Sequence, residues 1–135
     1  MRALLPLLLL ASACDGAKDT QDSTPEVVDC SARPTDIPSA RGEVAGVWDE
    51  DAGRLLFFGG DNGTPESCAS RTDFVGETWA YHPDCGNFEQ LAQDSGPPPR
   101  GRYAAALDPV NGRMIIHGGR FRDGTSGTYT LLDDT

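Results

Sequence analysis

Positive charge is scarce in this sequence. Its 135 residues include 11 Lys and Arg against 21 Asp and Glu, which gives a formal net charge of −10 at pH 7. An acidic surface of this kind is repelled by the phosphates of nucleic acid and by anionic lipid head groups. We therefore expect no nucleic-acid partner, and we expect a membrane partner only if something other than a basic patch attaches the chain.

Histidine is also scarce, and the familiar groupings of catalytic or metal-binding residues are missing. The two histidines, His82 and His117, have no Cys or carboxylate at metal-ligand spacing. The acidic runs 49–51 and 133–134 lack the spacing of a calcium loop and are expected to be solvated turns. No Ser/His/Asp set, phosphate-binding glycine loop or carboxylate pair is evident. The sequence thus predicts no metal, no cofactor and no catalytic residue, while enzyme activity stays an open question.

No apolar run is long enough to span a membrane, which takes about 20 residues. Residues 3–13 are apolar and Leu-rich and follow Arg2, which is typical of a secretory signal peptide. Small residues at 11–13 lead into Cys14, and this arrangement resembles the lipobox of bacterial lipoproteins. The resemblance implies removal of residues 1–13, acylation of Cys14, and a lipid anchor at the bacterial cell envelope, facing the periplasm or the exterior. An ordinary signal peptide with an unmodified Cys14 thiol is the alternative.

Residues 14–37 form an acidic segment with almost no apolar periodicity. Such a composition buries too little apolar surface to offset the entropy lost on ordering the chain. We expect a flexible tether that holds a folded domain, beginning near Pro38, away from the membrane.

The folded part contains an internal repeat. Residues 38–60 and 97–119 align at a constant offset of 59 with nine identities over 23 positions. The identities include an Arg-Gly pair near the start of each segment and a Gly-Gly pair at its end. A repeat of this length predicts stacked copies of one structural unit, because a single copy cannot bury its own apolar face.

Each copy contains two apolar stretches joined by a turn. The stretches are 44–48 and 54–58 in the first copy, and 103–107 and 113–117 in the second. Asn111-Gly112 is a strong hairpin signal, because both residue types tolerate positive φ. The second stretch of each copy is apolar on both faces, which is typical of strands covered on both sides. Residues 78–81 and 88–91 predict a second, outer hairpin, and hence a four-stranded antiparallel sheet.

These features resemble the kelch repeat, in which an Arg begins an apolar strand and a diglycine ends the next strand. A spaced Trp and Tyr then mark the third strand, and an aromatic residue opens the fourth. The matching residues are Arg41, Gly59, Gly60, Trp79, Tyr81 and Phe88, then Arg100, Gly118 and Gly119. The resemblance implies four-stranded blades of a β-propeller, with a first repeat at 38–96 and a second, truncated one at 97–135. Because Arg41, Arg54, Arg100 and Arg113 recur by repeat position, we expect them to bond strand ends or loop carbonyls.

A complete propeller needs more repeats than this sequence holds. Propellers have about 4–8 blades, whereas the sequence stops at Asp134-Thr135, which align with Glu77-Thr78 of the first repeat. We therefore expect an incomplete propeller of about one and a half blades. Either the chain is a fragment, or copies of it associate to cover the exposed apolar faces.

Three cysteines follow Cys14, and an exported protein meets an oxidising compartment in which a disulfide is expected. Cys68 and Cys85 lie in polar segments of the first repeat, so they are the predicted pair. Cys30 is left over in the tether. Two free thiols at Cys68 and Cys85 are the alternative.

Two functions of different classes remain. We favour a non-catalytic scaffold at the cell envelope, whose propeller loops bind a protein or a glycan. The alternative, which rests on the resemblance, is a piece of a kelch-type carbohydrate-active enzyme similar to galactose oxidase or to sialic acid epimerases. An oxidase of that kind holds copper through Tyr and His, with a Cys cross-linked to one Tyr. Tyr81, Tyr103 and Tyr129 show no recognisable arrangement of that sort, and a fold alone does not define a function.

Overall fold

The computed structural model describes residues 27–63, 74–93, 95–122 and 128–135. All regular elements in these ranges are β-strands, and all their pairings are antiparallel, as the predicted all-β class requires. No helix in this part of the chain is long and apolar enough to cross a membrane. The expected signal peptide, the acylation site Cys14 and the expected disulfide partner Cys68 lie outside the described residues.

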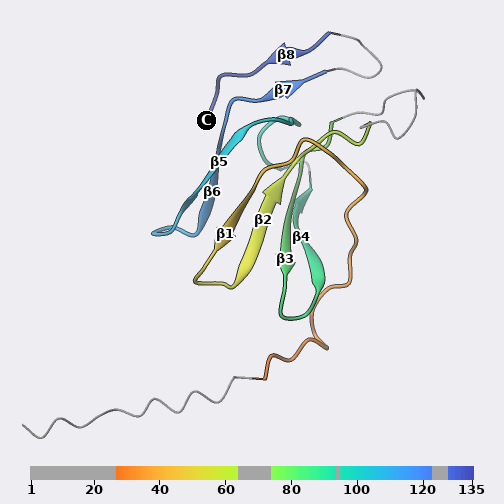
Figure 1. The fold of residues 1–135 in the computed structure, drawn as a ribbon, viewed down its shortest axis with the longest axis vertical. Helices are drawn as coiled ribbons and strands as arrows, with labels where there is room; N and C mark the ends of the chain where they lie inside the picture. The colour runs from red at the N-terminus through yellow and green to blue at the C-terminus, as the bar shows by residue number, and fades with distance from the viewer. Residues whose placement is uncertain (1–26, 64–73, 94, 123–127) are drawn as a thin grey trace, which may run out of the picture.

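The first repeat folds into one four-stranded sheet whose strands follow one another in chain order (Figure 1). The strands are β1 (Gly46–Asp49), β2 (Arg54–Phe58), β3 (Glu77–His82) and β4 (Asn87–Gln93). The two predicted hairpins are therefore confirmed, with the limits of β2 as predicted. His82, which follows the predicted strand 78–81, is the last residue of β3, because its backbone still pairs with Asn87.

The β1–β2 turn is held by a buried acidic side chain. Asp49 is only 5% exposed, and its carboxylate accepts hydrogen bonds from the Ala52 amide and the Arg54 guanidinium. Gly53 closes the turn with φ +59, a conformation that disfavours side chains. The expectation of a solvated turn at 49–51 is thus wrong for Asp49, since its charge is paired with Arg54.

The second repeat contributes a hairpin and a further short strand pair. The hairpin, β5 (Ala104–Asp108) with β6 (Arg113–His117), lies beside β1 of the first repeat (Figure 1). After the second diglycine, β7 (Arg120–Phe121) pairs with β8 (Thr130–Leu131). The sequence patterns did not predict this last pair, because two-residue strands carry no periodicity. No closed sheet is present among the described residues.

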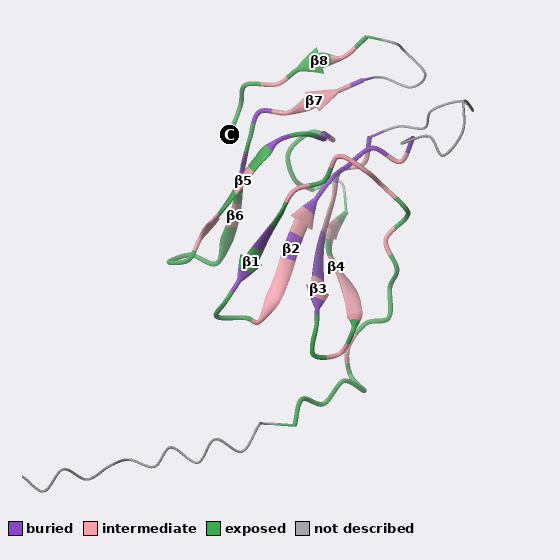
Figure 2. Cartoon of the chain, in the orientation of Figure 1, coloured by how far each residue is buried: buried purple, intermediate pink, exposed green. Residues whose placement is uncertain are grey.

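The hydrophobic core lies between the two repeats. Figure 2 shows buried and less buried residues alternating along β1 and β2. The inward residues of the first repeat are Val47, Leu56, Phe58 and Ala80, and those of the second are Tyr103, Ala105, Leu107, Met114 and Ile116. Among the described residues, no repeat packs against the other face of β1 and β2. The expectation that these strands are covered on both sides is therefore met on one side within the described residues.

Part of the expected tether is docked on the outer edge of the first sheet. Cys30 forms a disulfide with Cys85 in the β3–β4 turn, and Asp36 forms a β-bridge with Phe88. Asn87 on β4 donates a side-chain hydrogen bond to the Pro34 carbonyl. We call residues 30–36 the docked segment; it runs beside β4 in Figure 1. The prediction of a flexible tether does not hold for it, because these three links attach it to the sheet edge.

Candidate functional site

The repeated arginine of the first copy ties the diglycine to the start of β3. Arg41 donates to the Gly59 carbonyl at 3.2 Å and to the Glu77 carboxylate at 2.6 Å. The indole of Trp79 donates to the same Glu77 oxygen at 2.9 Å. Burial opposes ionisation of Glu77, but the hydrogen bonds from Trp79 and Arg41 outweigh it and lower the pKa of Glu77. Arg41 and Trp79 therefore share one carboxylate.

The second copy repeats this arrangement with a different acid. Arg100, fully buried, donates to the Gly118 carbonyl at 3.0 Å and to both carboxylate oxygens of Asp134, at 2.6 and 2.8 Å. These hydrogen bonds lower the pKa of Asp134. Asp134 thus has the place of Glu77 in the second repeat. It is half exposed, as expected of a solvated turn at 133–134, but its carboxylate is paired with Arg100. Of the recurring arginines, Arg41 and Arg100 bond loop carbonyls, as their repeat position predicts, whereas Arg54 bonds the Asp49 carboxylate.

The first diglycine lies directly against the second repeat. Gly59 and Gly60 have φ of +63 and +110, and Gly118 and Gly119 repeat this with +67 and +101. A Cβ on Gly59 would lie 2.5 Å from the Arg100 carbonyl oxygen. Gly60 donates its amide hydrogen to that same oxygen at 2.9 Å. The glycines are needed here both for the left-handed backbone and for the contact between repeats.

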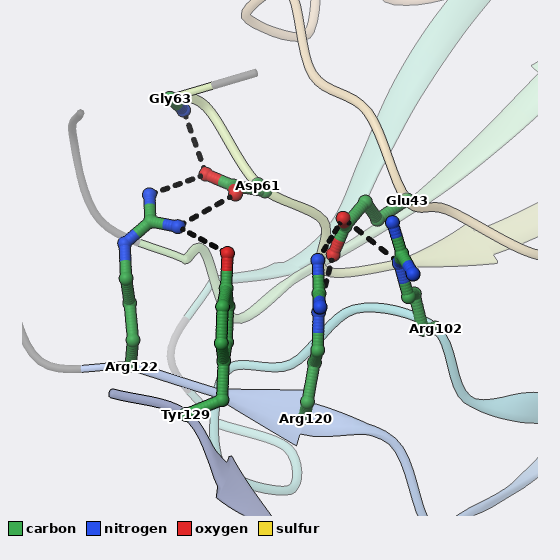
Figure 3. A network of polar contacts seen from close by, with 7 residues as sticks. All are labelled: Glu43, Asp61, Gly63, Arg102, Arg120, Arg122 and Tyr129. Atoms are coloured by element: carbon green, nitrogen blue, oxygen red, sulfur yellow. Dashed lines mark hydrogen bonds and ion pairs between the residues drawn. The ribbon is translucent and has the colours of Figure 1, made fainter. Parts of the chain in front are cut away.

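A cluster of charged side chains links the first repeat to the second (Figure 3). We call it the inter-repeat polar cluster; its members are Glu43, Asp61, Arg102, Arg120 and Arg122. Glu43 accepts from Arg102 at 2.9 Å and from Arg120 at 3.0 Å. Asp61 accepts two hydrogen bonds from Arg122, both 3.1 Å. Every one of these ion pairs joins an acid of the first repeat to an arginine of the second.

Burial differs across the inter-repeat polar cluster. The side chains of Arg122 and Asp61 are 0% and 6% exposed, whereas that of Arg102 is 62% exposed. Burial opposes the charge of Glu43, but hydrogen bonds from Arg120 and Arg102 prevail and lower the pKa of Glu43. The Arg120 guanidinium also stacks on the Tyr129 ring, 3.9 Å from its centroid. The cluster therefore joins the two repeats through paired charges that are buried at Asp61 and Arg122 and exposed at Arg102.

Sequence reasoning missed this cluster, although the repeat itself carried a signal. At the offset of 59, Glu43 aligns with Arg102 and Asp61 aligns with Arg120, so the charge reverses between copies. Glu43 and Arg102 also share a left-handed backbone, with φ of +62 and +56. Opposite charges at equivalent positions are favourable when equivalent positions of neighbouring units meet.

An open apolar face lies on the side of the first repeat away from the second. We call it the first open face; it is formed by Val44, Gly46, Trp48, Leu55 and Phe57. Trp48 is 50% exposed and Val44 is 36% exposed. The face holds a shallow depression of about 390 Å³. Its lining consists of Pro38, Ser39, Arg41, Val44, Ala45, Gly46, Leu55, Phe57 and Phe88. Aromatic and aliphatic atoms thus dominate a surface that water reaches.

Aromatic residues of the two outer strands border this face. Tyr81 and Phe88 are opposite each other on β3 and β4, with ring centroids 4.9 Å apart. Phe88 also meets Phe57 edge-on at 6.2 Å. Trp79 is buried at 4% exposure. The structure therefore brings Tyr81 and Phe88 together, and it places Trp79 at the Arg41–Glu77 pair instead.

The predicted disulfide between Cys68 and Cys85 is wrong. Cys85 is bonded to Cys30, with Cα atoms 5.5 Å apart, and Cys68 lies outside the described residues. The physical reason is the docked segment, which brings Cys30 to the β3–β4 turn. Cysteine spacing could not reveal this, since nothing local predicts that residues 30–36 lie along β4.

The histidines and tyrosines occupy separate environments. His82 lies between Arg33 and Glu89, and His117 is exposed beside Thr135. Tyr81 packs on Phe88, Tyr103 on Phe58 and Tyr129 on Phe74. Among the residues that the structure describes, no group of three or more His, Cys, Asp or Glu could hold a metal ion.

Comparison with known proteins adds no relative. No family model, curated protein or solved structure matches this chain. The function must therefore be argued from the site alone.

Proposed function

We propose that this protein is an exported, lipid-anchored scaffold that binds another protein through the first open face. The chain would be held at the bacterial envelope by acylated Cys14 and would carry kelch-type propeller repeats. The single observation that carries the binding role is the apolar surface formed by exposed Trp48 and half-buried Leu55 and Phe57, with its depression of about 390 Å³. Exposed apolar patches of this kind are typical of interaction sites.

The chemistry of the face favours a protein over a glycan. Sugars are held by several converging polar groups, whereas the described residues with polar side chains in the depression are Ser39 and Arg41. Arg41 is already bonded to Gly59, Glu77 and Ser39. An exposed Trp beside aliphatic residues is instead the composition of protein–protein hot spots.

The contacts of the charged residues at repeat positions also support a scaffold. The charged residues that recur or alternate between copies, from Arg41 and Arg100 to Glu43 and Arg102, are engaged in contacts within the fold. The Cys30–Cys85 disulfide fits an oxidising compartment. These features support a stable, exported framework that presents one apolar surface.

A photo-crosslinking residue placed at Trp48 in the full chain, expressed in a bacterial host, tests the proposal. We expect a covalent adduct with a defined protein in the envelope fraction, identified by mass spectrometry. The same residue at Val110, which is 89% exposed in the β5–β6 turn, is the control and should give no such adduct. Adducts that are absent at Trp48, or equal at both positions, would refute the binding role of this face.

A further inference from the structure

We infer that the partner of the first open face is a second copy of this chain, which docks head to tail through its second repeat. This inference rests on the proposed function and names its partner. It is carried by the contact between the two repeats within one chain, which serves as a template for a contact between chains.

The first open face, and a second exposed face on the second repeat, are equivalent to the two surfaces that already pack against each other within the chain. The second repeat buries Tyr103, Ala105, Leu107, Met114 and Ile116 against the first. At the offset of 59, these align with Val44, Gly46, Trp48, Leu55 and Phe57, the first open face. The first open face is therefore the equivalent of a surface that, one repeat later, is covered by a neighbouring repeat.

The surface that would pack against the first open face is exposed on the second repeat. Its outward residues are Ala104, Ala106, Ile115 and His117, which we call the second open face. They align with Ala45, Val47, Leu56 and Phe58, which cover the second repeat within the chain. Ile115 is 44% exposed, whereas its equivalent Leu56 is 4% exposed. One molecule thus carries both complementary surfaces, on opposite sides.

Unpaired backbone groups follow the same pattern. Within the chain, the Gly60 amide donates to the Arg100 carbonyl and the Arg102 amide donates to the Glu43 carbonyl, both at 2.9 Å. Four groups are equivalent to these at the offset of 59. The Gly119 amide and the Arg41 carbonyl correspond to the Gly60 amide and the Arg100 carbonyl, and the Glu43 amide and the Arg102 carbonyl correspond to the Arg102 amide and the Glu43 carbonyl. In the described part of the chain none of these four groups has a hydrogen-bond partner.

Head-to-tail docking pairs those groups with one another. The second open face of one copy supplies the Gly119 amide and the Arg102 carbonyl, and the first open face of another supplies the Arg41 carbonyl and the Glu43 amide. The second diglycine leaves space for another copy to approach. A Cβ on Gly118 would meet only the Leu132 carbonyl oxygen, at 3.2 Å, whereas a Cβ on the equivalent Gly59 would lie 2.5 Å from the Arg100 carbonyl oxygen. Four backbone groups that are unpaired in one chain thus become two hydrogen bonds.

Charge favours the same partner. Within the chain, acids of the first repeat face arginines of the second. Between copies, Arg102, whose side chain is 62% exposed, would face Glu43 of the next copy. Because equivalent positions of the two repeats carry opposite charges, the contact between copies is attractive, as is the contact within the chain. Like charges at both positions would repel each other. Because the two faces differ, such contacts propagate as a ring or a chain rather than stopping at a symmetric pair.

The test uses two full-length chains with different tags, co-expressed and purified through one tag in detergent. Unmodified chains should co-purify. Leu55→Asp in both chains disrupts the first open face of every copy. Ile115→Asp in both chains disrupts the second open face of every copy. Each should weaken association by roughly 100-fold, because a carboxylate would be buried without a partner. Val110→Asp in both chains is the control and should leave co-purification unchanged.

Mixing the variants gives the decisive result. A Leu55→Asp chain and an Ile115→Asp chain still share one intact pair of faces, so they should co-purify again, which also shows that both variants fold. Loss of association without this rescue, or association insensitive to Ile115→Asp, would overturn the head-to-tail contact. If copies do not associate while Trp48 crosslinks to a different protein, the proposed function stands and the self-association fails. If Trp48 forms no protein adduct at all, the binding function itself fails.

Discussion

The hydroxyl group of Tyr103 lies 2.6 Å from the carbonyl oxygen of Phe58 and 3.2 Å from its amide nitrogen. The same oxygen reaches the carbonyl and amide of Ala45, at 2.7 and 3.3 Å. A side chain of the second repeat is thus inserted at the end of the β1–β2 pair, which begins only at Gly46. In the second repeat the equivalent pair, Ala104 with His117, is directly joined. Tyr103 takes the place of one backbone pairing in the first repeat.

Replacing Tyr103 with Phe should therefore lower the free energy of unfolding by about 1–3 kcal/mol, because buried backbone groups of Ala45 and Phe58 lose their partner. The aromatic contact with Phe58 would remain. Tyr81→Phe is the matched control, because no hydrogen bond of the Tyr81 hydroxyl is found among the described residues. Denaturant unfolding of the three proteins measures the difference. Equal losses at both tyrosines would contradict the role given to Tyr103.

The buried pair of Asp61 and Arg122 should matter far more than the exposed end of the same cluster. Asp61→Asn removes one carboxylate that pairs with the Arg122 side chain, which is 0% exposed, and breaking a buried pair costs about 3–5 kcal/mol. Arg102→Gln removes a largely exposed side chain and should cost under about 1 kcal/mol. Denaturant unfolding compares the two variants. A similar cost for both would show that burial does not set the strength of this cluster.

Stability should decline in acid. Glu43 and Glu77 have pKa values lowered in the folded state, so the folded protein binds protons less readily than the unfolded chain. Their contribution is complete above the ordinary Glu pKa of 4.5 and is lost as the pH falls through the folded-state pKa. Thermal melting between pH 7 and pH 3 follows this loss. Glu77→Gln should be less stable at pH 7 and should show a weaker pH dependence; an unchanged slope would argue against Glu77 as a source.

Breaking the Cys30–Cys85 disulfide should release the docked segment. The bond spans 55 residues, and closing such a loop stabilises the folded state by about 4 kcal/mol in the chain-entropy model. Non-reducing peptide mapping of exported protein should recover a peptide linking Cys30 to Cys85. Cys30→Ser should lose that peptide and melt earlier, whereas Cys68→Ser should keep it. Recovery of a Cys68–Cys85 peptide from the native protein would falsify the pairing.

Acylation of Cys14 is expected from the lipobox-like residues at 11–14. In a bacterial host fed a palmitate analogue, the full chain should be labelled and should partition into detergent, since acyl chains anchor by about 0.8 kcal/mol per buried methylene. Cys14→Ala should abolish both. Labelling that persists in Cys14→Ala would place the lipid elsewhere, and an unlabelled native chain would indicate an ordinary signal peptide.

The all-β class, the repeat of 59 residues and the four strands of the first sheet were all predictable from sequence. These features depend on local chemistry: apolar stretches of strand length, turn residues such as Gly53 and Gly112, and a diglycine that tolerates positive φ. Local preferences act over a few residues, so they are readable along the chain. A closed propeller and the kelch relationship remain proposals.

What only the tertiary structure decided is which distant groups meet. Cys30 reaches Cys85 across 55 residues, Arg122 reaches Asp61 across 61, and Arg120 reaches Glu43 across 77. Each of these contacts depends on how one repeat stacks on the next or on where the docked segment lies against β4. The sequence determined the unit and its period; the packing of one unit on another determined the disulfide, the buried charges and the two open faces. The reason is that pairing over such distances is set by the summed burial of whole surfaces, which no single residue pattern encodes.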